Sequence, residues 1–239
     1  ALARQINSGD ATTGISNTST SSTINVDFTE TLDNGMGIAA NTDITPTGAV
    51  YLLTVSSDMG SFFTGSDWAS AVDNMDGAQG AGRYSGGGRI LAPNWNDGDA
   101  ASGNGFGIST SVAGASLQAT MGEGGNRAIS IAGRMNIAGA TVTAGNTDFD
   151  NAAVLDNGFI TVGYSVGGFN LGYNYYDSDS TSATQIGAST TVAGLGVGVS
   201  SASTDLGAGV ADTDAMGIHV NGALGGAFWV VDYVNTDNG

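Results

Sequence analysis

The fold is decided by the stretch from Ile160 to Tyr175, which reads ITVGYSVGGFNLGYNY. It consists of two runs with apolar residues at every second position, joined by two glycines. Such alternation is typical of a β-strand, whose successive side chains point to opposite faces. Glycine in so short a connection supplies the positive φ that a tight hairpin needs. The stretch therefore predicts an antiparallel hairpin with Val162 and Leu171 on an apolar face and Asn174 on a polar face.

The same kind of turn recurs along the chain. Five short phrases carry a glycine at the same place: Gly114, Gly139, Gly168, Gly194 and Gly226. Longer polar connections, three of them rich in aspartate, separate the hairpins at residues 122–126, 147–157, 177–184 and 202–214. Short turns at one end and long loops at the other are typical of a transmembrane up-and-down β-barrel. A soluble sandwich remains the alternative, because its core face shows the same alternation.

Fourteen strands are recognisable in this way. We expect them near residues 22–31, 35–44, 48–57, 59–65, 104–112, 114–122, 127–137, 139–147, 157–167, 169–177, 184–193, 195–202, 214–222 and 226–235. One interval, Ser66 to Asn104, shows no sustained alternation. Loops of this length are uncommon in compact domains and are usually functional or disordered. The sequence thus predicts an all-β, antiparallel barrel with one exceptional loop at 66–104.

Composition restricts the possible functions. The 239 residues include 22 acidic residues, five arginines and no lysine, for a formal net charge of −17. We expect no nucleic-acid partner, because so few cations cannot neutralise phosphates. There is one histidine and no cysteine, and no catalytic motif surrounds His219, so we expect no enzyme. The aspartates lack the spacing of a Ca²⁺-binding loop, so no cofactor is expected beyond weak Ca²⁺ or Mg²⁺ binding at the acidic outer loops.

Three segments carry a resemblance to a known family. They are VDFTETLDNGM (Val26–Met36), TVSSDMGSF (Thr54–Phe62) and AVDNMDG (Ala71–Gly77). In pattern they resemble the first inner turns and the start of the third loop of general porins of Gram-negative bacteria, of the alphaproteobacterial type. The resemblance implies a single barrel domain over 1–239 with sixteen strands, which forms a homotrimer in the cell outer membrane. It also implies that the third loop folds into the pore opposite a basic wall.

Two features depart from that family. The chain ends Asp237-Asn238-Gly239 where family members usually end in an aromatic residue, and lysine is missing from the basic wall. With fourteen strands recognised out of sixteen, we expect that the terminal strand or strands of the barrel lie outside this sequence.

The expected site residues form two groups. The long loop supplies the charges of a pore constriction: Asp67, Asp73, Asp76, Arg83, Arg89, Asp97 and Asp99. Positions on the polar face of the strands supply the pore wall: Gln118, Arg134, Asn136, Asn174 and His219. We expect Asp73 and Asp76 to face a basic patch that includes Arg134.

These observations predict a porin that passes small hydrophilic solutes and ions by diffusion, with outer-membrane lipid around it. Acidic residues outnumber arginines in the long loop by five to two, which favours a cation-preferring pore. Two alternatives remain. One is an extracellular acidic β-rich structural protein, such as a surface-layer, adhesin or fibre subunit. The other is a substrate-specific channel of the same architecture.

Overall fold

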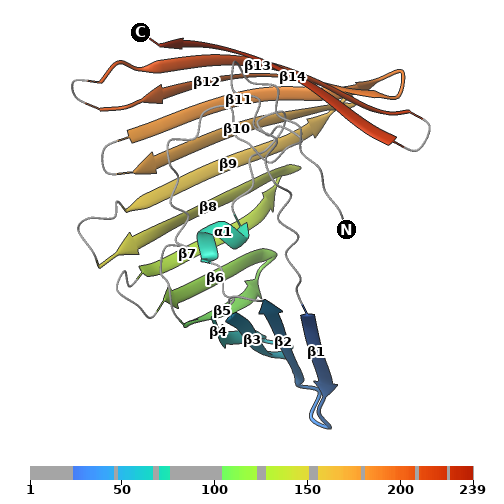
Figure 1. Ribbon diagram of the computed structural model, residues 1–239, viewed down its shortest axis with the longest axis vertical. Coiled ribbons are helices and arrows are strands. Elements are labelled where there is room, and N and C mark those ends of the chain that lie inside the picture. Colours follow the sequence, from blue (N-terminus) through green and yellow to red (C-terminus); the bar gives the residue numbers. More distant parts are fainter. Residues whose placement is uncertain are drawn as a thin grey trace.

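The structure is a computed structural model that describes residues 24–45, 48–66, 70–75, 104–122, 128–150, 156–178, 181–207, 210–224 and 227–238. The described chain forms one antiparallel sheet in which each strand pairs with its neighbours in sequence (Figure 1). Its fourteen strands are β1 (Ile24–Thr31), β2 (Gly37–Thr45), β3 (Gly48–Ser57), β4 (Gly60–Gly65), β5 (Gly105–Val112), β6 (Ala115–Gly122), β7 (Ala128–Ile137), β8 (Ala140–Phe149), β9 (Asn157–Val166), β10 (Phe169–Ser178), β11 (Thr181–Val192), β12 (Leu195–Asp205), β13 (Thr213–Leu224) and β14 (Ala227–Asn238). A single helical turn, α1 (Ala71–Met75), lies between β4 and β5.

The fourteen strands expected from the alternation are confirmed in order and type. The described sheet runs from β1 to β14 without a pairing between those two strands, so it is an open, curved wall (Figure 1). The count of sixteen implied by the family resemblance exceeds the fourteen strands of the described residues. No helix in the described ranges is long and apolar enough to cross a membrane.

One connection is shorter than expected. The strand expected to start at residue 184 begins at Thr181 and pairs with Ser178, so β10 and β11 approach within two residues of each other in sequence. Serine and threonine dominate these positions, and threonine fits a pleated strand well even where the strand is polar. The polar residues from Thr181 onward, which suggested a loop, therefore form the end of a strand at the edge of the wall.

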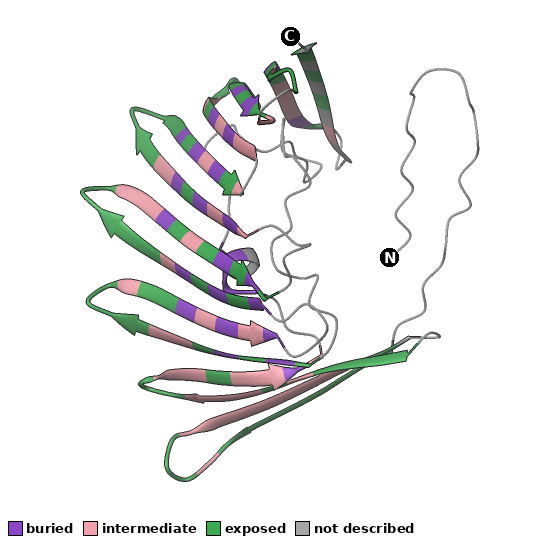
Figure 2. Cartoon of the chain, turned by 90° about the vertical axis from the view of Figure 1, so that its left-hand side faces the viewer, coloured by how far each residue is buried: buried purple, intermediate pink, exposed green. Residues whose placement is uncertain are grey.

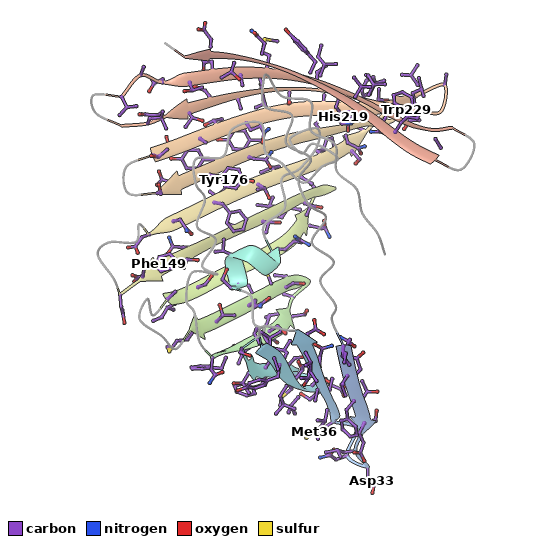
Figure 3. The ribbon with its side chains drawn as sticks, in the orientation of Figure 1. Asp33, Met36, Phe149, Tyr176, His219 and Trp229 are labelled. Atoms are coloured by element: carbon purple, nitrogen blue, oxygen red, sulfur yellow. The ribbon has the colours of Figure 1, made fainter. Side chains whose placement is uncertain are left out.

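The hairpin turns have the geometry that the glycines predict. Positive φ is found at Gly114 (84°), Gly139 (85°), Gly168 (83°) and Gly194 (80°). The residue before each of them also has a positive φ of 50° to 58°, although three of the four are alanines. Two consecutive positive φ values define the type I′ turn, whose twist matches that of the flanking strands. The first hairpin turns differently, at Asp33 to Met36 (Figure 3), where Leu32 N–H donates to the Met36 carbonyl at 2.8 Å.

These turns provide a stability test. We expect Gly114→Ala to lower the free energy of unfolding by about 1–2 kcal/mol, because a Cβ disfavours positive φ. No atom lies within 4 Å of the added Cβ, so the loss reports backbone strain without a clash. The matched variant Ala113→Gly relieves the same strain one residue earlier and should not destabilise the protein. Equilibrium unfolding in denaturant measures both, and equal losses for the two would contradict the turn assignment.

The two faces of the sheet differ sharply in polarity. Exposed and buried residues alternate along many of the strands (Figure 2). The outer, convex face exposes large apolar side chains on almost every strand, among them Ile108, Ile131, Ile160, Leu171 and Ile218. The inner face carries buried polar side chains: Gln118, Thr120, Ser130, Thr143, Thr147, Asn157, Thr161, Asn174, Gln185, Ser200 and Thr204. Within the described residues no second sheet covers the apolar face. This pattern is the reverse of a soluble sandwich and matches a wall with lipid outside and a polar interior.

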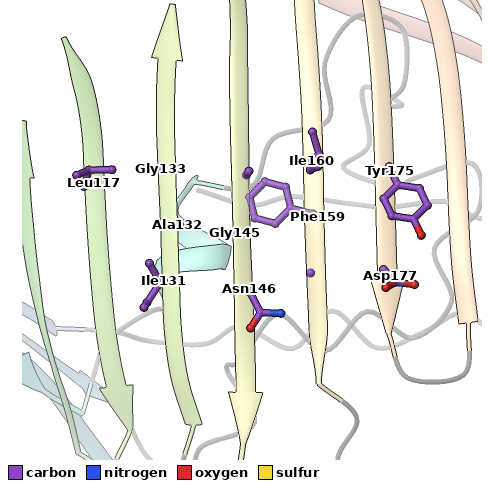
Figure 4. A pocket seen from close by; sticks show the side chains of 12 residues that line it. Leu117, Ile131, Ala132, Gly133, Gly145, Asn146, Phe159, Ile160, Tyr175 and Asp177 are labelled. Carbon is purple, nitrogen blue, oxygen red and sulfur yellow. The ribbon is translucent and has the colours of Figure 1, made fainter. Parts of the chain in front are cut away.

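Small residues leave one shallow groove on the outer face. Its volume is about 500 Å³, and it runs across β6 to β10 between Leu117, Ile131 and Ile160 (Figure 4). Gly133 and Ala144 pair across β7 and β8 at its floor. The groove lies on the face opposite α1, so it is not part of the site described next.

Candidate functional site

The start of the long interval lies on the inner face of the sheet. Helix α1 packs against β6, β7 and β8 on the concave side (Figures 1 and 2). The two described ends of the interval, Ser66 and Asn104, both bond to Tyr51 of β3. Ser66 N–H donates to the Tyr51 carbonyl at 2.8 Å, and the Tyr51 hydroxyl donates to Asn104 Oδ1 at 3.1 Å. The segment therefore leaves and re-enters the sheet at one fixed point.

Hydroxyl groups of the wall hold the first residues of α1. The N–H of Ala71 donates to Thr120 Oγ1 at 2.9 Å, and the N–H of Val72 donates to Ser130 Oγ at 3.0 Å. Thr147 Oγ1 donates to the same Ser130 oxygen at 3.0 Å, which fixes its position. The first N–H groups of a helix have no partner within the helix. Here hydroxyl groups of the inner wall supply those partners, and they hold the first residues of α1 in place.

An apolar cluster completes this attachment. Val72 is 0 % exposed and packs with Phe159, Tyr176 and Ala183, which stand side by side on β9, β10 and β11. The rings of Phe159 and Tyr176 stack with centroids 6.4 Å apart and planes inclined by 24°. Burying one valine side chain is worth about 1.5–3 kcal/mol. The contact ties the loop to strands beyond those that its hydrogen bonds reach.

Arg134 fixes the other end of α1. Its Nη2 donates to the Met75 carbonyl at 2.7 Å, and its Nε donates to Thr143 Oγ1 at 3.2 Å. The carbonyls at the end of a helix lack partners, and a cation there is favourable. Thr143, which is fully buried, orients the guanidinium from the neighbouring strand. Arg134 therefore acts as a clamp on the loop, and it is the one arginine in the described ranges.

The predicted constriction charges are mostly outside the described part of the chain. This applies to Asp67, Asp76, Arg83, Arg89, Asp97 and Asp99. Asp73 lies in α1, but its side chain is not among the described atoms. The chain between Asp73 and Asp76 passes Arg134, because the guanidinium binds the carbonyl of Met75. That both aspartates face Arg134 stays a prediction.

The five predicted wall residues all lie on the inner face. Arg134 and Asn136 follow each other on β7, and Gln118 stands opposite Ala132 of the same strand. Asn174 continues the transverse row that starts at Arg134 and passes through Thr143 and Thr161. His219 lies on β13, opposite Gly198 and Asp232, six strands away from β7 (Figure 3). The structure thus brings four of the five into one region of the wall and leaves His219 outside it.

The sequence pattern missed the residues that hold the loop. Phe159 and Tyr176 sit on the inner face, which the alternation assigned to Ser, Thr, Asn, Gln and Gly. Each stands beside an apolar residue of the outer face, in the pairs Phe159–Ile160 and Tyr175–Tyr176. Two consecutive large apolar residues in a strand necessarily place one on each face. Two large apolar residues in succession therefore indicate an apolar contact on the inner face of the sheet.

No catalytic or metal site emerges from the described residues. They contain no group of three or more His, Asp or Glu side chains placed to hold a metal ion. What the arrangement does provide is steric and electrostatic: a segment fixed against the inside of a curved polar wall, with one guanidinium beside it.

Comparisons with known proteins agree with this geometry. No family model matches the chain, and no curated protein matches it significantly. A solved porin structure is similar with a TM-score of 0.67 at 16 % identity, over 89 % of this chain and 86 % of that one. A mutant of the Rhodopseudomonas blastica porin is similar with a TM-score of 0.61 at 15 % identity, over 89 % and 88 % of the two chains. With its antiparallel up-and-down wall, apolar outside and polar inside, this chain has the fold of the bacterial porins.

Proposed function

We propose that this protein is an outer-membrane porin that lets small hydrophilic solutes and ions diffuse through a water-filled lumen. The single observation that carries the proposal is the attachment of α1 to the inner wall of a sheet whose outer face is apolar. An outer face of this kind is stable only against lipid or another apolar surface. A segment held inside the wall narrows the passage that the wall encloses.

The homotrimer implied by the resemblance is part of the proposal, as is the absence of a nucleic-acid partner. So is the assignment as a channel without catalytic activity, which the porin fold of the similar structures supports. Weak binding of Ca²⁺ or Mg²⁺ at the acidic outer loops also remains a prediction. The alternative of an extracellular structural protein is less well supported, because its sheet would need a second layer over the apolar face.

The experiment that tests the function is reconstitution. Purified protein added to a planar lipid bilayer should give stepwise increases in KCl conductance, and liposomes that contain it should swell in small sugars. Heat-dependent gel migration in detergent should accompany this activity. Protein that is soluble without detergent and gives no steps would contradict the assignment.

We expect the pore to prefer cations. Two carboxylates, Asp27 and Asp43, lie on the inner face of β1 and β2, where each accepts a hydrogen bond of 2.6 Å from a neighbouring asparagine amide. We infer that these carboxylates, in a chain of net charge −17, make the interior negative, and negative potential in a narrow passage concentrates cations. The reversal potential in a KCl gradient should therefore show K⁺ preferred over Cl⁻.

The double variant Asp27→Asn with Asp43→Asn should reduce that preference. Glu30→Gln is the matched control, because Glu30 lies in the same hairpin but on the opposite face. It removes one charge without changing the interior, so the reversal potential should stay the same. Preference for Cl⁻ in the unmodified protein would refute the proposed selectivity.

A further inference from the structure

A second feature of the inner wall lies beside the loop attachment and is not used by it. Four strands form a polar hollow of about 260 Å³ near the short-turn end of the wall. The polar side chains around it are those of Thr141 on β8, Ser165 on β9, Asn170 on β10 and Ser189 on β11. Its volume is slightly below the roughly 300–1,000 Å³ typical of sites for drug-sized ligands. It would therefore hold a molecule smaller than a typical drug.

The floor of the hollow is bare backbone, because Gly163 of β9 lines it on the inner face. Gly163 belongs to a row of glycines, with Gly172 opposite it on β10 and Gly187 opposite Gly172 on β11. Gly172 and Gly187 continue the row beyond the hollow, whose lining residues include neither of them. With rows two residues apart, the polar rows on either side of the glycines are about 13 Å apart along the strands.

The hydrogen bonds around the hollow leave both donors and acceptors available. Ser165 Oγ donates to Asn170 Oδ1 at 2.7 Å, and within the described part of the chain the amide N–H groups of Asn170 remain available as donors. Thr141 Oγ1 donates to Asn136 Oδ1 at 2.8 Å and keeps its lone pairs as acceptors. The Ser189 hydroxyl can serve in either role. A ligand whose own groups both donate and accept matches this set.

The lining carries no charged side chain. This distinguishes the hollow from the loop attachment, where Arg134 lies, and from β1 and β2, where Asp27 and Asp43 lie. A charged solute would gain no ionic partner here. The charge pattern therefore favours a neutral, hydroxyl-rich molecule over an ion.

A second observation, independent of the hollow, points the same way. In the row on the other side of the glycines, Gln185 is 3 % exposed, and among the described residues neither polar atom of its amide has a hydrogen-bond partner. Thr161, fully buried in the same row, likewise has a hydroxyl oxygen without a partner in the described part of the chain. Burying such a group without a partner is unfavourable. Both sides of the glycine row thus offer polar groups that a hydroxylated ligand or water can satisfy.

The hollow also lies on the route of a permeating solute. Thr141 is two residues from Thr143, which orients Arg134, so the site adjoins the loop attachment on its short-turn side. A solute that passes the attached segment would reach the hollow next.

We propose that this hollow binds small neutral polyols in passage, which makes the pore favour hydroxyl-rich solutes over other neutral solutes of equal size. This inference rests on the pore function proposed above. It needs no conformational change, because the polar groups and the glycine floor are already in place.

The test compares xylitol with triethylene glycol, two neutral solutes of nearly equal mass but with five and two hydroxyl groups. Each is titrated into planar bilayers that hold single pores in KCl, and the current is corrected for bulk conductivity. Xylitol should reduce the current along a saturating curve, whereas triethylene glycol should not saturate. Asn170→Ala, which removes the amide donors, should raise the half-saturating xylitol concentration about tenfold.

Two further variants control for size. Gly163→Val fills the floor of the hollow and should abolish saturation. Ser116→Val adds the same side chain to the inner face of β6, outside the hollow, and should leave the xylitol response unchanged. Each variant must first show KCl conductance, which confirms that it has folded.

The outcomes separate the two proposals. Pores that conduct KCl but give no saturating xylitol response, or respond equally to triethylene glycol, would overturn the polyol site alone. The same holds if Asn170→Ala and Gly163→Val both respond as the unmodified protein does. A protein that forms no conducting pore would overturn the pore function and this site with it.

Discussion

Removing residues 73–88 should raise the single-channel conductance while the fourteen-stranded sheet stays intact. The deletion begins inside α1 and takes away the Met75 carbonyl that Arg134 binds. The pairing of β4 with β5 and both bonds to Tyr51 lie outside the deleted range. The barrel wall therefore keeps its contacts, and the passage loses the segment that we propose narrows it.

A point variant should give a smaller change in the same direction. Arg134→Met removes the hydrogen bonds to the Met75 carbonyl and to Thr143 but keeps most of the side-chain volume. A hydrogen bond from a charged group contributes about 1.5–3 kcal/mol, so the C-terminal end of α1 should detach part of the time. We expect a noisier current with a higher mean, recorded in the same bilayers.

The matched control shortens a different connection. Residues 206–210 lie between β12 and β13, at least four strands away in the sheet from β6, β7 and β8, against which α1 packs. Their deletion should leave the conductance unchanged. Equal conductance in the 73–88 deletion and the unmodified protein would show that the attached segment does not form the constriction.

Most of the wall could be predicted from the sequence because two local rules determine it. A period of two fixes which residues share a face, and the recurring glycines fix where the chain reverses. The hairpin at Ile160 to Tyr175 shows both: Ile160, Leu171 and Tyr173 are exposed on the outer face, and Asn174 is buried on the inner one. Strand ends were less predictable, since polar residues such as Thr181 extend a strand as readily as they form a loop.

The loop attachment could not be predicted in the same detail because it depends on long-range contacts. Asp73 and Asp76 suggest an ionic contact with Arg134, which stays a prediction, and the contact that the structure shows is between Arg134 and the backbone carbonyl of Met75. Every residue has a backbone carbonyl, so the sequence does not show which carbonyl a side chain will bind. Thr120 and Ser130 looked like ordinary wall residues, and only the position of α1 shows that they bind its first N–H groups. Of the long interval, the described stretch Ser70 to Met75 lies on the inner face, and the inward folding of the whole interval as a constriction stays a prediction.

Introducing a charge on the outer face should destabilise the protein far more than the same charge on the inner face. Val162 lies at the middle of β9, opposite Tyr173, with its side chain on the apolar face. An arginine on the lipid face of a barrel costs about 2–4 kcal/mol at the bilayer midplane and roughly 0–1 near the interface. We expect Val162→Arg to show the larger loss. Leu171→Arg should show a smaller one, because Leu171 is only two residues from the start of β10.

The control must lie on the inner face without disturbing its packing. Asn174 is unsuitable, because its side chain is 0 % exposed. An arginine there would destabilise the protein for lack of room, and the loss would say nothing about contact with lipid. Asn170 is exposed, adjoins Leu171 on the same strand and points to the opposite face. Asn170→Arg should therefore cost no more than about 1 kcal/mol, which is the typical contribution of a hydrogen bond such as the exposed one that it accepts from Ser165.

Equilibrium unfolding in lipid vesicles with increasing denaturant measures all three variants. The order expected from the structure is Val162→Arg least stable, then Leu171→Arg, then Asn170→Arg close to the unmodified protein. The order matters more than each value, because it depends on both face and depth. Equal losses for Leu171→Arg and Asn170→Arg would mean that the apolar face does not contact lipid, and the membrane assignment would fail with it.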